Sequence, residues 1–281
     1  AGSAHQPVLE TNARFDARLS TEGVTCAVCH VRDGVVLGPW GDSKAPHAVR
    51  QDPRLLSEQV CAQCHQATAS YTDILVCTFD TAHEWRASPY ATEGRACPSC
   101  HMPEVRRAVA IGGPVRDARR HLFFGSKIPK REHLGEGERR YYDLYPSGLS
   151  VAIAGEGPAW KLVLTNAHAG HLLPTGDPER FILVKADLVD AAGRVIGRRS
   201  YRIGQRWVWN PKARKLGDNR LKPRETREVP LHFSGPRSAK PALIRVTVEN
   251  WRMSRENAAY HKLTGVYPLS AVVLREEKRL P

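Results

Sequence analysis

Apolar and polar side chains alternate through the second half of the chain, whereas apolar side chains are sparse in the first half. From Leu149 onward, four segments have apolar residues at every second position, a period that gives a β-strand one apolar face. These positions are Leu162 and Leu164; Ile182, Val184, Ala186 and Leu188; Val229, Leu231 and Phe233; and Ile244, Val246 and Val248. With no long helical pattern between the segments, the sequence predicts an antiparallel, immunoglobulin-like β-sandwich over residues 149–281.

The first 125 residues show neither a strand period nor a helical period, and they hold too few apolar side chains to fill a core by themselves. Residues 126–148 are polar and are predicted to be a linker. The predicted fold class is therefore α+β, with a mostly irregular or helical domain over residues 1–125 followed by the β-sandwich.

The spacing of the cysteines indicates which cofactor the first domain binds. Six of the seven cysteines lie in three copies of the pattern C-x-x-C-H, at residues 26–30, 61–65 and 97–101. This pattern is typical of c-type haem attachment, in which two thiols form thioethers to one haem and the adjacent imidazole binds its iron. The sequence thus predicts a trihaem cytochrome c domain whose porphyrins supply the missing apolar volume. The anchors are Cys26, Cys29, Cys61, Cys64, Cys97 and Cys100, and the proximal ligands are His30, His65 and His101.

Two other interpretations of the cysteines fit less well. A four-cysteine zinc site built from the second and third motifs would leave Cys26 and Cys29 without partners. A redox-active C-x-x-C pair has no need of a following histidine in three copies.

The chain carries 42 Lys and Arg against 29 Asp and Glu, a formal net charge of +13. Because haem attachment of this kind takes place outside the cytoplasm, we expect a periplasmic or extracellular protein whose signal peptide has been removed. The basic residues are spread along the chain, which favours an acidic redox protein as partner and argues against nucleic acid. No apolar run is long enough for a membrane span, so the protein is not expected to span a membrane.

Longer motifs resemble those of multihaem c-type cytochromes, relatives of the tetrahaem carriers that accept electrons from hydroxylamine oxidoreductase. The run from Trp85 through Ser88-Pro89-Tyr90, Gly94 and Cys97 to Pro103 resembles the segment leading into one of their haem sites. Gly23-Val24-Thr25-Cys26 and His121-Leu122-Phe123-Phe124-Gly125 also resemble that group, and the loop from Asn166 to Gly176 resembles forms with a C-terminal β domain. The resemblance implies electron transfer among closely packed haems that are mostly ligated by two histidines.

Histidines are the expected distal ligands. Methionine is nearly excluded, since the chain has only Met102 and Met253, and Met102 directly follows a proximal histidine. The resemblance implies that His47 is a distal ligand between the first two haems. His121 and His171 are the other two main candidates, and ligation by His171 would make the β domain a clamp on the haem domain. Less favoured candidates are His83, His168 and His5.

His5 and Cys77 stand outside this scheme. Ala1-x-x-Ala4-His5-Gln6 has the shape of a haem motif with alanine at both cysteine positions, which is either the remnant of a fourth site or an ordinary N-terminus. Cys77 has apolar neighbours and is expected to be a buried thiol, with an axial thiolate, a further attachment or an intermolecular disulfide as alternatives.

Three function hypotheses follow. The first is an electron carrier, because ligation by two histidines leaves no open coordination site and low to intermediate potentials should follow. The second is a multihaem redox enzyme with one open-site haem, for which Arg95, His83, Tyr90 or Cys77 could supply the facing groups. The third is a subunit of a larger cytochrome complex, a homo-oligomer or a polymeric cytochrome filament.

Overall fold

The computed structural model describes residues 13, 16–18, 23–41, 45, 47–72, 75–109, 111–129, 135–156, 159–233 and 240–281. His5 lies outside these residues, and for Cys77 only the backbone is described. The predictions for the His5 motif and for the Cys77 thiol therefore fall outside the described part.

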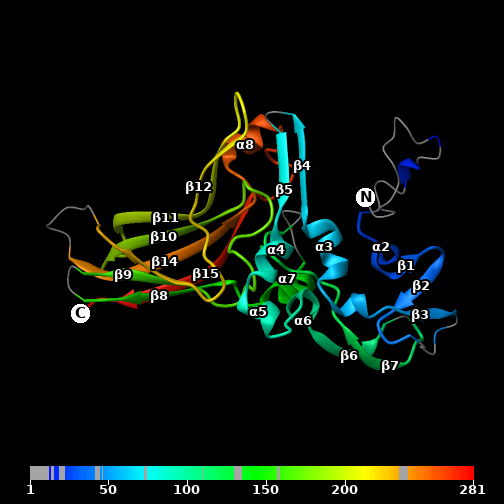
Figure 1. Ribbon diagram of the computed structural model, residues 1–281. Helices are drawn as coiled ribbons and strands as arrows, with labels where there is room; N and C mark the ends of the chain where they lie inside the picture. The colour runs from blue at the N-terminus through cyan, green and yellow to red at the C-terminus, as the bar shows by residue number, and fades with distance from the viewer. Residues whose placement is uncertain are drawn as a thin grey trace.

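In the N-terminal part, up to Pro129, short helices alternate with short strands (Figure 1). The helices are α2 (Cys26–His30), η2 (Pro53–Leu56), α3 (Gln59–His65), α4 (Thr81–Arg86), α5 (Pro89–Thr92) and α6 (Cys97–His101). The strands are β1 (Val31–Arg32), β2 (Val35–Gly38), β3 (Val49–Gln51), β4 (Ala67–Thr72), β5 (Leu75–Phe79), β6 (Glu104–Ala108) and β7 (Val115–Arg119). They form a three-stranded sheet, β1-β2-β3, and the two hairpins β4-β5 and β6-β7.

The predicted fold class is wrong. Strands make up 39% of the structure and helices 19%, in seven short α-helices among the described residues, so the chain is mostly β and its N-terminal part is not mostly helical. The strands there have two to six residues and several are polar on both faces, as in Glu104–Ala108. Such strands are too short and too polar to show a period of two in the sequence.

The C-terminal part holds two antiparallel sheets. In the chain, α7 (Glu136–Asp143) comes before both sheets, and α8 (Arg255–Tyr260) lies between their last two strands. One sheet has five strands in the order β12-β11-β10-β14-β15, and the other has three in the order β13-β9-β8. Their bounds are β8 (Leu149–Ala154), β9 (Lys161–Asn166), β10 (Phe181–Asp190), β11 (Val195–Val208), β12 (Arg214–Asp218), β13 (Thr226–Pro230), β14 (Pro241–Trp251) and β15 (Ser270–Arg279).

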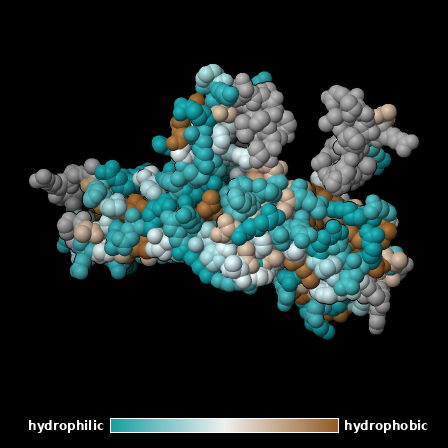
Figure 2. All heavy atoms as spheres, viewed as in Figure 1, coloured by the Kyte–Doolittle hydropathy of each residue, from teal (hydrophilic) through white to brown (hydrophobic). Residues whose placement is uncertain are grey.

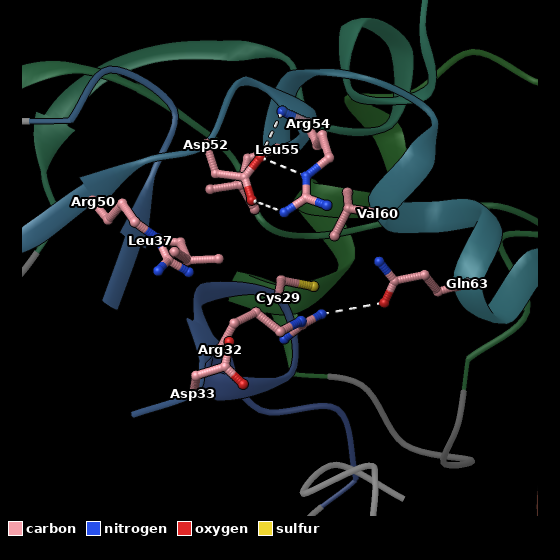
Figure 3. A pocket seen from close by; sticks show the side chains of 10 residues that line it. All are labelled: Cys29, Arg32, Asp33, Leu37, Arg50, Asp52, Arg54, Leu55, Val60 and Gln63. Carbon is pink, nitrogen blue, oxygen red and sulfur yellow. Dashed lines mark hydrogen bonds and ion pairs between the residues drawn. The ribbon is translucent and has the colours of Figure 1, made fainter. Parts of the chain in front are cut away.

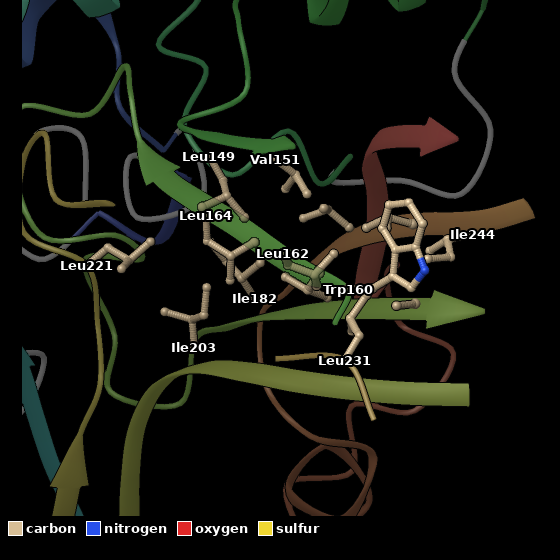
Figure 4. Close-up of a cluster of buried hydrophobic side chains, with 14 residues drawn as sticks. Leu149, Val151, Trp160, Leu162, Leu164, Ile182, Ile203, Leu221, Leu231 and Ile244 are labelled. Carbon is tan, nitrogen blue, oxygen red and sulfur yellow. The ribbon is translucent and has the colours of Figure 1, made fainter. Parts of the chain in front are cut away.

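One apolar core lies between these two sheets (Figure 4). Leu162 and Leu164 of β9 alternate inward from the smaller sheet, and β10 and β14 contribute alternate positions from the larger one. The buried set is Leu149, Val151, Trp160, Leu162, Leu164, Ile182, Val184, Ala186, Ile203, Leu221, Leu231, Ile244, Val246 and Val248. Burial of these side chains stabilises the fold of the C-terminal part.

The N-terminal part has almost no apolar core of its own. Among the described residues before Tyr145, the buried hydrophobic side chains are Leu37, Ala82, Tyr90 and Ile128, against nineteen from Tyr145 onward. Large apolar side chains of the same part, such as Trp40 at 63% and Val24 at 80%, are exposed instead. Brown patches over this part in Figure 2 interrupt an otherwise largely hydrophilic surface. The N-terminal part therefore buries far fewer apolar side chains than the C-terminal part does.

Candidate functional site

Each C-x-x-C-H motif coincides with a short helix that ends at the histidine. These helices are α2, the end of α3, and α6 (Figure 1). In a helix, residues i, i+3 and i+4 lie on one face, so both cysteines and the histidine of a motif project to the same side. After each helix the backbone leaves the helical conformation, at Val31, Gln66 and Met102. The local structure thus presents two thiols and one imidazole together three times.

The three motif helices are neighbours in space. The Cys61 and Cys97 thiols lie close enough to interact, and this interaction, together with burial, raises the pKa of Cys61. The first and second motifs meet where Arg32 Nη2 donates to Gln63 Oε1 at 3.2 Å. Burial raises the pKa of Cys29, which is close enough to Cys64 to be affected by its charge. The motifs therefore form a series from first to second to third.

The histidine of the first motif faces His121. The His30 and His121 ring centroids are 6.1 Å apart and their planes are 44° from parallel. His30 Nδ1 donates to the Leu37 carbonyl at 2.9 Å, and His121 Nδ1 donates to the Arg119 carbonyl at 2.9 Å. Phe123, which has a positive φ of 52°, packs its ring edge against the imidazole of His121 at 5.8 Å. Segment 119–124 therefore fixes the position of His121.

The histidine of the third motif faces His171, which comes from the C-terminal part. Their ring centroids are 6.3 Å apart and the planes are 12° from parallel. His101 Nδ1 donates to the Phe124 carbonyl at 3.0 Å, and His171 Nδ1 donates to the Leu172 carbonyl at 2.9 Å. Burial lowers the pKa of His171 to about 4, so its ring is neutral at neutral pH. A neutral imidazole is the form that binds a metal.

The separation of the ring centroids in both pairs matches that of two imidazoles on opposite sides of one metal ion. Metal–imidazole bonds are about 2 Å long, which places two opposed ring centroids about 6 Å apart. All four Nδ1 atoms donate to backbone carbonyls, so Nε2 is the unprotonated nitrogen in each ring. Such a hydrogen bond is the usual support of a metal-binding histidine. The residues present therefore fit an iron with two histidine ligands at the first and third motifs.

The second motif lacks such a facing ring among the described residues. Burial lowers the pKa of His65, and the nearby His101 and Arg180 lower it further. His47 is exposed, with Nδ1 3.3 Å from the Ala48 carbonyl, and His83 is exposed with Nδ1 3.4 Å from Asp80 Oδ2. His168 is also exposed. The predicted distal roles of these three histidines remain predictions.

Asn166, at the end of β9, holds the loop that carries His171. Its side chain is fully buried, and Nδ2 donates to the His171 carbonyl at 3.0 Å and to the Leu221 carbonyl at 3.2 Å. Its Oδ1 accepts from the Ala169 amide at 3.1 Å. The following Gly170 lies against Tyr90, where an added Cβ would be 3.2 Å from the Tyr90 ring. A glycine here lets the loop approach α5 closely.

A buried ion pair joins the two parts beside this loop. Arg220 Nη1 is 2.6 Å from Glu84 Oε1, and the two side chains are 8% and 4% exposed. Glu84 Oε2 also accepts from Thr175 Oγ1 at 2.6 Å. Directly after α5, Glu93 pairs with Arg224 at 2.6 Å. Sequence reasoning missed this network, because an arginine and a glutamate 136 positions apart carry no local signal of pairing.

A cavity of about 210 Å³ opens beside Cys29, between α2 and the region of η2 and α3 (Figure 3). Arg32, Arg50 and Arg54 line it. The Arg54 guanidinium holds the pKa of the Asp52 carboxyl at about 2. The cavity combines apolar walls such as Leu37 with cationic side chains.

Among the residues that the structure describes, no three His, Cys, Asp or Glu side chains are grouped to hold a metal ion. In the same residues no helix is long and apolar enough to cross a membrane.

The arrangement as a whole is a fold of the multihaem cytochrome c type. It is similar to the solved structure of a penta-heme cytochrome c552 from Thermochromatium tepidum, with a TM-score of 0.69 and 17% sequence identity over 96% of this chain and 80% of that chain. No model of a known protein family matches the chain. A search of curated proteins also found no match.

Proposed function

We propose that the chain is an electron-transfer protein with three covalently bound c-type haems, and that it works in the periplasm or outside the cell. The observation that carries the proposal is that the histidines of two of the three motifs each face another histidine. The ring centroids of the two pairs are 6.1 and 6.3 Å apart, and every Nδ1 is hydrogen bonded to a backbone carbonyl. The structural neighbour, named a penta-heme cytochrome c552, supports it.

In this proposal the haem iron supplies one-electron chemistry, and the chain fixes position and environment. The six motif cysteines would anchor the groups, and His30 and His101 would hold two of the irons. His121 and His171 would hold the same two irons, and an iron held by two histidines would leave no position for a substrate. The contact of Cys61 with Cys97 and that of Arg32 with Gln63 support a series of closely spaced centres. An acidic redox protein is the partner that the charge of +13 favours.

One observation favours a second candidate, a redox enzyme with an open site at the second motif. His65 has no facing histidine in the described residues, and the cationic Arg180 lies near it. A third alternative, a subunit of a cytochrome complex or filament, would take the missing ligand from a neighbouring molecule.

Haem counting tests the proposal. A pyridine haemochrome assay should return three haems per chain, and replacing Cys61 and Cys64 together by alanine should return two. A chain without covalent haem would overturn the proposal. A wholly low-spin oxidised spectrum supports the carrier, whereas a high-spin band in the wild type would favour the enzyme.

A further inference from the structure

Segment 119–124 serves two haem sites at once. The Arg119 carbonyl orients His121 opposite the first motif, and the Phe124 carbonyl orients His101 of the third motif. The ring of Phe124 packs against Tyr142 at 4.4 Å and against Tyr145 at 5.0 Å. Tyr145 is therefore one side chain away from the residue that orients His101.

The hydroxyl of Tyr145 is buried and unsatisfied. Tyr145 is 8% exposed, and its oxygen has no hydrogen-bond partner in the described chain. Native proteins rarely leave a buried hydroxyl without a partner, and such a group calls for a ligand or ion. The neighbouring Tyr142 is only partly buried and is not among the unsatisfied groups.

A cation belongs to the same segment. Arg120 lies in segment 119–124, whose Phe124 ring contacts Tyr145; it is partly buried, and its charge acts on Tyr145. No side-chain or carbonyl partner of its guanidinium occurs in the part of the chain that the structure describes. Arg107, Arg120 and Arg140 all act on the adjacent Tyr141, so the local potential is positive. A hydroxyl donor and a guanidinium together match the carboxylate group.

We propose that the Tyr145 hydroxyl and the Arg120 guanidinium together bind a propionate carboxylate of one of the haems that flank segment 119–124. This inference rests on the proposed function, because the carboxylate comes with the haem. Donors and a positive charge at a propionate offset its negative charge, which favours the reduced iron. Tyr145 and Arg120 thus bind the propionate and raise the reduction potential of that haem.

The test is a spectroelectrochemical titration of the holoprotein with Tyr145→Phe, with Tyr142→Phe as the matched control on the same Phe124 ring. We expect Tyr145→Phe to lower one haem potential by about 28 mV, equivalent to a threefold change in the oxidation equilibrium, while Tyr142→Phe changes none. Arg120→Gln should lower the same potential further, and Arg120→Lys, which keeps the charge, should restore most of it.

Two further variants show which haem supplies the carboxylate. His121→Ala should make the first haem high-spin, and His171→Ala the third, so that each titrates separately. A Tyr145→Phe shift in either high-spin curve supports the proposal and identifies the haem. Three haems per chain with unchanged potentials in Tyr145→Phe and Arg120→Gln would overturn this inference alone, whereas a wild type without covalent haem would overturn the proposed function as well.

Discussion

At the scale of single residues, the candidate site depends on side chains that hold the backbone of a candidate ligand. Asn166 satisfies two backbone carbonyls and one amide in a fully buried position, and in doing so it fixes the backbone of His171. Sequence reasoning singled out the loop that contains both residues. It could not assign the three partners, since the Leu221 carbonyl is 55 positions away.

Asn166→Ala should destabilise the protein by about 2 kcal/mol, because buried carbonyls lose their donor. It should also raise the high-spin fraction of the third haem as His171 loses its support. Urea unfolding and the oxidised absorption spectrum measure the two effects. Asn210→Ala, at an exposed position, should change neither. An unchanged stability in Asn166→Ala would contradict the role given to these bonds.

Glu179 predicts a pH dependence of stability. Burial raises its pKa from 4.5 to about 7, aided by Asp177, while the hydrogen bond from Asn257 opposes the shift. Between these pH values the folded protein holds a proton that the unfolded chain has released, so this site makes stability fall as pH rises from 4.5 to about 7.

Glu179→Gln should remove that fall and should leave the protein more stable than the wild type at pH 8. Urea midpoints measured from pH 4 to pH 8 test this. Glu276→Gln, on the exposed part of β15, is the control and should follow the wild-type curve. Parallel curves for Glu179→Gln and the wild type would show that the carboxyl is not the group responsible.

At the scale of elements, the long strands were predictable and the short ones were not. β9, β10 and β14 each bury alternate residues over six or more positions, which is the pattern read from the sequence. In the sequence, Leu231 and Phe233 continue that pattern, but β13 ends at Pro230. Around the motifs, strands such as Val31–Arg32 are too short to show a period of two in the sequence, so no pattern predicts them.

Contacts between elements of the two parts include the pair of Arg220 with Glu84 of α4. Arg220→Met should cost about 3 kcal/mol, because it leaves the buried Glu84 carboxylate without its cation. Arg245→Met breaks the exposed pair with Glu277 and should cost less than about 1 kcal/mol. Chemical denaturation of both variants compares the two costs, and equal values would contradict a special role for the buried pair.

At the scale of the whole molecule, the C-terminal part supplies side chains and contacts that the N-terminal part lacks. The N-terminal part has few buried apolar side chains, and the C-terminal part contributes His171, Arg220 and the close approach of Gly170 to Tyr90. The motifs and two of the facing histidines were predictable, since each carries a local pattern. Their pairing was not, because it depends on how distant segments fold against each other.

The most direct test is the oxidised absorption spectrum of the His171→Ala variant, compared with that of His232→Ala. His171→Ala should keep three haems per chain and convert one of them from low-spin to high-spin, since His101 then binds its iron alone. His232→Ala, an exposed histidine of the same part that is not a candidate ligand, should leave the spectrum unchanged. A fully low-spin His171→Ala protein with its haems intact would contradict the claim that the C-terminal part supplies an axial ligand.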